Sequence, residues 1–383
     1  MAPNDMTTSS PRLLLNAEPF GFGPAAAIAG FFPHLRPHFD AIGYVGKRHT
    51  LDLQRSLTYD AIHDVSEMGK EERAEVLAPI FAQYDVFLSA MDHKMVELAK
   101  KAGLKVFYYD ALTWYWPEIP ASVRTADLYM GQNFFGVEER LHEIFREKSH
   151  AHAVSPIVSK VKPTQNKQHI LINLGGLQNP FWPVEEITAF ASKIIDAIKS
   201  APPQEEKIII ASSCAISECL KDRGVKTYSR AEMETLLAES KLAFMTPGLG
   251  NIYDAAAYNI PTIWLPPAND SQGQQLKLLQ QNVMCDQALD WHDFMNGDSV
   301  NYKAVQTDVL KTIAALAKTL VTDDDIQNRL GKVITQKYET LKDRHDSQTQ
   351  ALIKRFGTGG EKQVADLVTQ YSRITPLEDG PAG

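Results

Sequence analysis

Short apolar runs alternate with amphipathic stretches along most of the chain. In residues 12–110, strands are predicted at RLLLNA, FDAIGYV, YDVFLSA and KVFYYD, and helices at PAAAIAGFFPHL and HKMVELAKKAG. Strands that lack a polar face are typical of parallel sheets covered by helices on both sides. The pattern therefore predicts an α/β fold.

The same alternation starts again after a polar stretch, residues 154–168, which contains two prolines and has no clear period. Beyond it, strands are predicted at HILIN, KIIIASS, VKTYS, LAFMT and PTIWLPP, with helices at EEITAFASKIIDAIKSA, RAEMETLLAES and NIYDAAAYN. The polar stretch reads as a linker between two domains. Two such domains leave a cleft between the carboxyl ends of their strands, where ligands bind in sheets of this kind.

We predict domains over 11–155 and 167–345, each Rossmann-like, and C-terminal helices over 346–375 that pack back on the first domain. A length of 383 residues suits two domains. The residues after Tyr302 form long helical periods without the turns that would announce a third domain.

Composition narrows the class of partner. A net charge of −8 argues against nucleic acid or an anionic membrane, since both require a basic surface. No apolar run reaches the roughly 18 residues of a membrane span, and the opening MAPNDMTTSSPR has no apolar signal-peptide core. Three cysteines without a C-x-x-C pair do not favour disulfides or structural zinc. We expect a reduced cytoplasmic protein, monomeric or homodimeric.

Three loops at predicted strand ends carry glycines and polar residues: AEPFGFGP, NLGGLQNPF and TPGLGN. Glycine lets the backbone approach a ligand, and the helix that follows offers free N–H groups to a phosphate. Each loop alone is equally well a plain strand–helix turn, and Gly21 and Gly23 lack the third glycine of a dinucleotide motif. Asp254 is expected in the first turn of a helix that starts near Asn251, where the helix dipole favours a carboxylate. The polar NDSQGQQ is expected to form a ligand loop after the strand PTIWLPP.

The block GLGNIYDAAAYNIPTIWLPPANDSQGQQ resembles the donor-site signature of the GT-B nucleotide-sugar glycosyltransferase superfamily. The likeness is greatest to the branch that contains the bacterial transferase that adds N-acetylglucosamine to the lipid-linked muramoyl peptide. The segment NLGGLQ also resembles the glycine loop that opens the second domain in that branch. It implies a GT-B fold, with two Rossmann-like domains facing each other across a cleft. The donor-binding residues that it implies are Gly175, Gly176, Thr227, Tyr228, Gly248, Leu249, Gly250, Asn251, Asp254, Gln274 and Gln275.

The resemblance gives most of these residues a role. Asp254 matches the acid, usually Glu, that holds the ribose, and its side chain is one methylene shorter. Residues 248–251 would hold the diphosphate through backbone N–H groups, and Gly175 and Gly176 would face it from the other side. Gln274 and Gln275 match the pair that meets the sugar, while residues 227–228 fall in the base-binding segment.

The first domain departs from the superfamily, because the loop PFGFGP lacks the histidine that serves as general base in many inverting members. This loop resembles the F-G-W-G loop of cytosylglucuronate-synthase-type enzymes, and DALTWYWPEIP resembles an aromatic segment of that group. Candidates for the base are Glu18, Asp92 and His93, although Asp92 is equally a helix N-cap and His93 a helix-start residue. Candidates for acceptor binding are Phe20, Gly21, Gly23, Asp110, Trp114 and Trp116, whose aromatic rings would equally suit core packing.

The resemblance implies a metal-independent, inverting glycosyltransferase. Its donor would be a nucleotide diphosphate sugar, of UDP type, bound as a co-substrate with no cofactor. Its acceptor would be a small molecule of specialised-metabolite or nucleoside-antibiotic biosynthesis. The alternatives are a sugar-nucleotide 2-epimerase and a non-catalytic nucleotide-sugar-binding protein on the same fold.

Overall fold

The computed structural model describes residues 10–69, 73–146, 150–158, 164, 166–177, 182–297 and 299–373. The chain forms two compact units. Unit 1 consists of the described parts of Met1–Glu18, Pro24–Ser155 and Gly360–Gly383, and unit 2 of Pro19–Gly23 and the described parts of Pro156–Gly359.

Unit 1 is built on a seven-stranded parallel sheet of order β3-β2-β1-β4-β5-β6-β7. Its strands are β1 (Arg12–Ala17), β2 (Ala41–Gly46), β3 (Ala61–Asp64), β4 (Val86–Ala90), β5 (Lys105–Asp110), β6 (Leu128–Gln132) and β7 (Ala151–Val154). Its helices are α1 (Gly23–Leu35), α2 (Arg73–Phe81), α3 (His93–Lys101), α4 (Ala121–Arg124), α5 (Val137–Phe145) and α14 (Gly360–Arg373).

Both faces of this sheet are covered, as its apolar strands require. On one face, Phe31 of α1 packs edge-on against Tyr109 of β5, with ring centroids 5.0 Å apart. On the other, Phe145 of α5 lies 4.7 Å from Tyr129 of β6. Successive side chains of a strand point to opposite faces, so Tyr108 belongs to the face that α5 covers.

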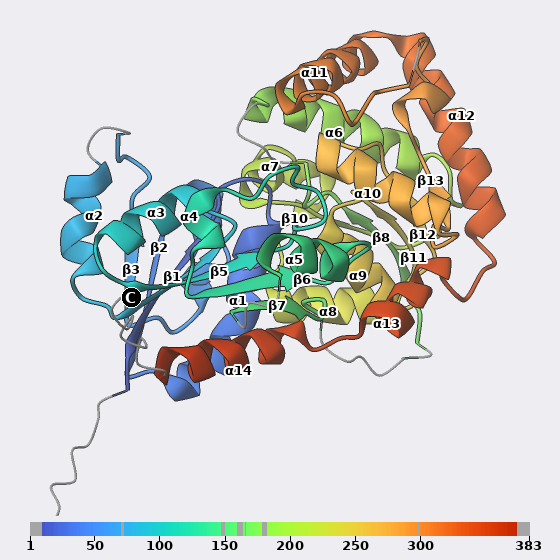
Figure 1. Cartoon of the computed structure of the whole chain (residues 1–383). Helices are drawn as coiled ribbons and strands as arrows, with labels where there is room; N and C mark the ends of the chain where they lie inside the picture. Colours follow the sequence, from blue (N-terminus) through green and yellow to red (C-terminus); the bar gives the residue numbers. More distant parts are fainter. Residues whose placement is uncertain are drawn as a thin grey trace, which may run out of the picture. The chain divides into compact units, whose positions relative to one another are not determined.

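The last helix that the structure describes, α14, belongs to unit 1. In Figure 1, α14 is drawn in red although the sheet that it covers is blue to teal, and its contacts are with β6 and β7. Its own Val364 and Val368 are buried, its Tyr371 hydrogen-bonds with His152 at 2.9 Å, and its Gln363 accepts a bond from the Ser155 N–H at 2.8 Å. This helix therefore packs against the sheet at the edge that β7 forms.

Unit 2 is built on a six-stranded parallel sheet of order β10-β9-β8-β11-β12-β13. Its strands are β8 (His169–Asn173), β9 (Ile208–Ala211), β10 (Val225–Lys226), β11 (Ser240–Met245), β12 (Thr262–Trp264) and β13 (Gln287–Ala288). Its helices are α6 (Val184–Lys199), α7 (Cys214–Cys219), α8 (Arg230–Glu239), α9 (Leu249–Ala257), α10 (Asp270–Gln281), α11 (Gln306–Thr322), α12 (Asp324–Leu341) and α13 (Ala351–Phe356).

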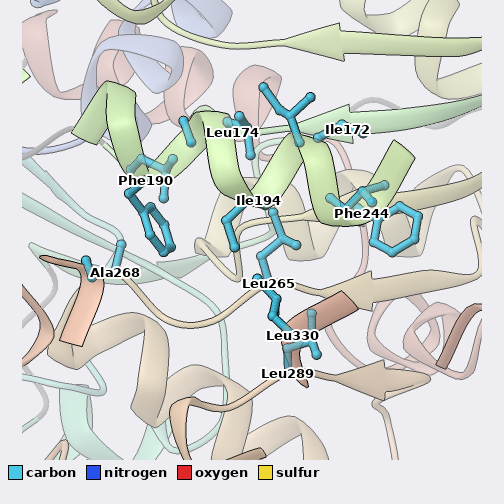
Figure 2. Close-up of a cluster of buried hydrophobic side chains, with 14 of the residues drawn as sticks. Ile172, Leu174, Phe190, Ile194, Phe244, Leu265, Ala268, Leu289 and Leu330 are labelled. Carbon is cyan, nitrogen blue, oxygen red and sulfur yellow. The ribbon is translucent and has the colours of Figure 1, made fainter. Parts of the chain in front are cut away.

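The core of unit 2 joins its sheet to the helices α6, α11 and α12. Figure 2 shows Ile172 and Phe244 of the central strands near Phe190 and Ile194 of α6, with Leu330 of α12 close by. These apolar side chains are at most 2% exposed. Each such side chain contributes about 1.5 to 3 kcal/mol to stability by leaving water, so the central strands form a rigid base for the loops at their ends.

The predicted α/β fold with parallel sheets is confirmed. Several elements differ in detail. NDSQGQQ does not form a loop: Asn269 accepts a bond from the Gln272 N–H at 2.9 Å and caps α10, which begins at Asp270. The segment VKTYS contributes only Val225–Lys226 to a strand.

The strands β3, β6, β7 and β13 lie in segments for which no strand was predicted. The edge strand β3 has alternating half-buried and exposed residues, and β13 has two residues. Such short or edge strands lack the continuous apolar signal that marks a central parallel strand.

Candidate functional site

Each unit has a point where its strand order reverses. In unit 1 the reversal lies between β1 and β4, and in unit 2 between β8 and β11. In open parallel sheets, ligands bind outside the carboxyl ends of the strands at this point. The loops there begin at Glu18 and Met91 in unit 1, and at Leu174 and Thr246 in unit 2.

Glu18 and Asp92, two of the predicted catalytic residues, meet at the reversal in unit 1. The two carboxyl groups are close enough to act on one another electrostatically. Burial and the charge of Asp92 raise the pKa of Glu18 to about 8, although the Lys47 and Lys94 ammonium groups act in the opposite direction. Glu18 is thus protonated at neutral pH and can accept a proton once it has ionised.

The position of Asp92 is fixed by its neighbours. Its N–H donates to the Ser89 hydroxyl at 3.2 Å, and that hydroxyl donates to Asn16 Oδ1 at 2.9 Å. Met91, between β4 and Asp92, adopts a φ of 68°, which is uncommon for a residue other than glycine. Such backbone strain persists where surrounding contacts impose it, and it occurs often at functional sites.

Asp92 also has the structural role considered from the sequence. Its carboxylate accepts a bond from the Met95 N–H at 3.1 Å and caps α3. The two oxygens of a carboxylate allow it to cap a helix and to bind Glu18 as well. His93, the third predicted catalytic residue, is the first residue of α3 and is partly exposed.

Asp110 lies 1% exposed at the end of β5 and organises the aromatic segment after it. It accepts bonds from the Tyr129 hydroxyl at 2.6 Å, the Leu112 N–H at 2.7 Å and Trp116 Nε1 at 3.3 Å. Burial raises the pKa of Asp110, and these bonds oppose the shift. The Asp110 carboxylate therefore already accepts hydrogen bonds from three groups of the protein. Its role in the structure is to hold the aromatic segment in place.

The other predicted acceptor-binding residues are aromatic or lie in the first glycine loop. Trp114 packs against Phe134, with ring centroids 5.4 Å apart, and its Nε1 is buried without a hydrogen-bond partner among the described residues. Phe20 is partly buried. Gly21 has a φ of 65°, a conformation that favours glycine, and Gly23 begins α1.

In unit 2, the N-terminus of α9 lies at the reversal point without a side-chain cap. Gly248 is the N-cap residue, and residues 249–251 form the first turn. An uncapped helix start presents N–H groups and a positive dipole end, which suits an anion. These residues, Gly248, Leu249, Gly250 and Asn251, are the ones predicted to hold a diphosphate.

The glycines of the loop after β8 have a different environment. The Gly175 N–H donates to Asn173 Oδ1 at 3.0 Å, and the Gly176 N–H donates to Thr246 Oγ1 at 3.1 Å. A Cβ atom on Gly176 would lie 2.6 Å from Thr246 Oγ1 and 2.9 Å from Gln272 Nε2. Both amides are therefore already used within the protein, and glycine at 176 is required by close packing. Gln178 and Asn179 of the same loop lie outside the described residues.

Asp254 lies in the second turn of α9, not the first, because the helix begins at Leu249. It is 7% exposed and faces the Arg230 guanidinium, with two N···O distances of 3.4 Å. Burial raises the pKa of Asp254, and the charge of Arg230 opposes the shift. Its partner is thus a cation 24 residues away in the sequence rather than the helix dipole.

The two predicted sugar-binding glutamines differ from one another. Gln274 Nε2 donates to the Tyr302 carbonyl at 2.8 Å. Gln275 is 2% exposed, and its Oε1 atom has no hydrogen-bond partner in the part of the chain that the structure describes. A buried acceptor without a donor is costly, so Gln275 is the one suited to a ligand hydroxyl.

The predicted base-binding residues lie between β10 and α8. The Thr227 hydroxyl bonds with Ser217 at 2.9 Å and with the Ser212 carbonyl at 3.1 Å, which holds this loop in place. Tyr228 is partly buried, and its burial raises the pKa of the phenol. Tyr228 therefore keeps a neutral ring at the surface.

Two residues of the site were missed from the sequence. Arg230 contacts Asp254, and Gln272 links the loop after β8 to the start of α10 by donating to the Gly176 carbonyl at 2.8 Å. No periodicity or motif indicates either contact, since each joins segments far apart in the sequence. Within the described ranges, no group of three or more His, Cys, Asp or Glu residues is arranged to hold a metal ion.

No protein-family model matches the sequence, and no curated protein matches it. Solved structures similar to the chain include a UDP-glucosyltransferase from Polygonum tinctorium capable of glucosylating indoxyl, with 12% identity and a TM-score of 0.53 over 96% of this chain and 100% of that one. Others are UGT89C1 of Arabidopsis thaliana complexed with UDP (11% identity, TM-score 0.51, 95% and 100% covered) and MurG of Acinetobacter baumannii (11%, 0.50, 94% and 99%).

The chain has the GT-B fold. The GT-B fold that the donor-like block implied is confirmed. In this GT-B chain, the predicted donor residues all belong to unit 2, and most of the predicted catalytic and acceptor residues belong to unit 1. Among the described residues, no helix combines the length and the apolar character needed to cross a membrane.

Proposed function

We propose that this chain is a glycosyltransferase that moves a sugar from a nucleotide diphosphate sugar, of UDP type, to a small acceptor with inversion. The observation that carries the proposal is the reversal point of unit 2, where the uncapped start of α9 and the buried Asp254 lie on one helix. The first suits a diphosphate and the second suits ribose hydroxyls. The GT-B fold supports this assignment, since similar structures include UDP-dependent glycosyltransferases.

Donor binding is assigned to unit 2. The first-turn N–H groups of α9 take the charge of the diphosphate, so no metal ion is required for that purpose. Asp254 accepts bonds from the ribose, and Gln275 Oε1 accepts one from a sugar hydroxyl. The Arg230 guanidinium balances the charge of Asp254.

Acceptor activation is assigned to the Glu18–Asp92 pair. In its ionised form the pair takes the proton of the acceptor's O–H or N–H group through Glu18. The freed electron pair of the acceptor forms a bond to the anomeric carbon. The bond from that carbon to the diphosphate oxygen breaks, and the nucleotide diphosphate leaves with its electrons. Attack opposite to the leaving group inverts the anomeric configuration.

Calorimetric titration with UDP-glucose, UDP-N-acetylglucosamine, dTDP-glucose and GDP-mannose tests the donor assignment. Binding of at least one of them, competed by its nucleoside diphosphate, is expected. A chain that binds none of them is not a glycosyltransferase of this kind.

Transfer is then measured as release of UDP in the presence of cytosine, indoxyl and 3,4-dichloroaniline, with product analysis by mass spectrometry. A glycosylated acceptor is the expected product. A C2 epimer formed from the donor alone would identify a sugar-nucleotide epimerase instead, and binding without any product would identify a binding protein.

A further inference from the structure

Tyr108 is a largely buried phenol whose hydroxyl forms no hydrogen bond with any residue that the structure describes. It lies on β5 and is 3% exposed. Its hydroxyl oxygen is not one of the fully buried side-chain atoms that lack a partner among the described residues. The hydroxyl therefore keeps a small accessible surface. The ring itself is well packed, with its centroid 5.7 Å from that of Tyr129.

The polar residues beside Tyr108 in the sheet are all paired. In register, Tyr108 lies between Ser89 of β4 and Tyr129 of β6, and Ser89 lies beside Asn16 of β1. Side chains in register on neighbouring strands share a face. Ser89 donates to Asn16 at 2.9 Å, and Tyr129 donates to Asp110 at 2.6 Å. Within this row across the sheet, the hydroxyl of Tyr108 is the one that remains available.

Three carboxyl groups of unit 1 act electrostatically on this phenol, which is already buried. Asp110, Asp92 and Glu18 each act electrostatically on the phenol, and together with burial they raise its pKa well above the ordinary value. The phenol is therefore a neutral O–H donor at any physiological pH. It lies beside the reversal point between β1 and β4, where Glu18 and Asp92 meet.

We infer that the Tyr108 hydroxyl binds the acceptor and positions it for Glu18. It donates a hydrogen bond to an oxygen or nitrogen atom of the acceptor, next to the O–H or N–H group that gives its proton to Glu18. The acceptor class is thus a small molecule with a hydrogen-bond-accepting atom adjacent to its nucleophile. This inference rests on the glycosyltransferase function proposed above.

The variant Tyr108→Phe tests it, with Tyr109→Phe as the matched control. Both remove one hydroxyl from β5, but Tyr109 faces α1 and its hydroxyl donates to Gln132 at 2.5 Å. Transfer from UDP-glucose is measured with cytosine, which has a carbonyl beside its N1–H group, and with 3,4-dichloroaniline, which has no such acceptor beside its amine. UDP affinity is measured by calorimetry, and stability by urea unfolding.

For Tyr108→Phe, kcat/KM for cytosine is expected to fall about 10- to 100-fold, the loss typical of one hydrogen bond to substrate. UDP affinity is unchanged, the urea midpoint is unchanged or higher, and 3,4-dichloroaniline is affected less than cytosine. For Tyr109→Phe, the urea midpoint falls because an internal bond is lost, and kcat/KM stays within about twofold.

Two results would overturn the inference while leaving the proposed function in place. One is a kcat/KM for Tyr108→Phe within about twofold of wild type, which would mean that the hydroxyl meets only water. The other is a loss of stability like that of Tyr109→Phe, which would mean an internal partner. Failure of the proposed function is seen in the wild type alone, as absence of UDP-sugar binding, and it removes the inference as well.

Discussion

Glu18 is held as a neutral acid at pH 7, because burial and the charge of Asp92 raise its pKa to about 8. A general base works only in its ionised form. We therefore expect kcat/KM for transfer to rise tenfold per pH unit below about pH 8 and to level off above it. Glu18→Gln cannot ionise, so its activity should fall by about 100- to 10,000-fold and lose this rise.

A pH–rate profile of wild type and Glu18→Gln between pH 5.5 and 9.5 checks this prediction. Nucleotide affinity of the variant should match that of wild type, since Glu18 belongs to unit 1. A profile that stays flat across pH 8 in wild type would remove Glu18 from the role of base.

Asp254→Ala should weaken UDP binding about 10- to 100-fold, because the ribose hydroxyls lose a charged acceptor. The control is Glu234→Ala, which removes the other carboxylate bound to Arg230 at 3.0 Å. It leaves Asp254 in place, so UDP affinity should change by less than about threefold. Calorimetry measures both affinities. Equal losses in the two variants would indicate that Arg230 alone is responsible.

For single residues, the sequence indicated which positions could take part in the site, but it did not indicate which side chains contact one another. The donor-like block pointed to Asp254, and the positions after apolar strands pointed to Glu18 and Asp92. The sequence could not reveal that Asp92 lies near Glu18 and raises its pKa, or that Arg230 faces Asp254. These contacts join segments that are adjacent only after folding.

Among the elements, the loop after β8 depends on close packing against Thr246 and Gln272. Gly176→Ala places a Cβ atom 2.6 Å from Thr246 Oγ1, so it should break the bond between that oxygen and the Gly176 N–H. We expect a loss of about 1 to 3 kcal/mol in the free energy of unfolding. Gly250→Ala is the control, since its Cβ would meet no atom within 4 Å, and alanine in a helix is favoured by up to about 1 kcal/mol.

Urea unfolding of the two variants decides between packing and backbone freedom as the reason for glycine at 176. If Gly176→Ala were as stable as Gly250→Ala, the close approach of the two loops would not be important for stability.

The periodicity of apolar residues predicted whether most segments are helices or strands. It predicted the residues at which these elements begin and end less accurately. Central strands such as β4 and β11 are continuous apolar runs, so the sequence predicted them. The start of α10 was mistaken for a loop because its first turn, DSQG, is polar and its apolar residues come later. The cap at Asn269 and the burial of Asp270 explain why this polar segment is nevertheless a helix.

For the molecule as a whole, α14 ties the end of the chain to unit 1. A chain that stops at Gly359 exposes the surface of β6 and β7 that Val364, Ala365 and Val368 cover. Burial of these side chains contributes roughly 3 to 6 kcal/mol, so unit 1 should lose that much stability. Hydrogen exchange should rise in β6 and β7 and stay unchanged in β8 and β11.

Asp366→Ala is the control for this truncation, because Asp366 is exposed on α14 and forms a surface ion pair with Lys362. Its effect should be below about 0.5 kcal/mol. A truncated chain with normal exchange in β6 and β7 would mean that α14 covers the sheet without stabilising it.

The number of sheets and their parallel character could be predicted from the restart of the strand–helix pattern after residue 154. The order of the strands could not, because it depends on pairings between distant segments such as Leu13 with Val86. The reversal points that locate the candidate site follow from that order, so the sequence indicated the loops without indicating which of them lie side by side.

The return of α14 to unit 1 has a consequence for the order of events during synthesis. The ribosome completes all of unit 2 before residues 360–373 emerge, whereas β6 and β7 have been synthesised long before. Domains generally fold as units while the chain is made. Unit 1 therefore keeps an uncovered apolar surface until residues 360–373 leave the ribosome, and that interval is when the nascent protein most needs a chaperone.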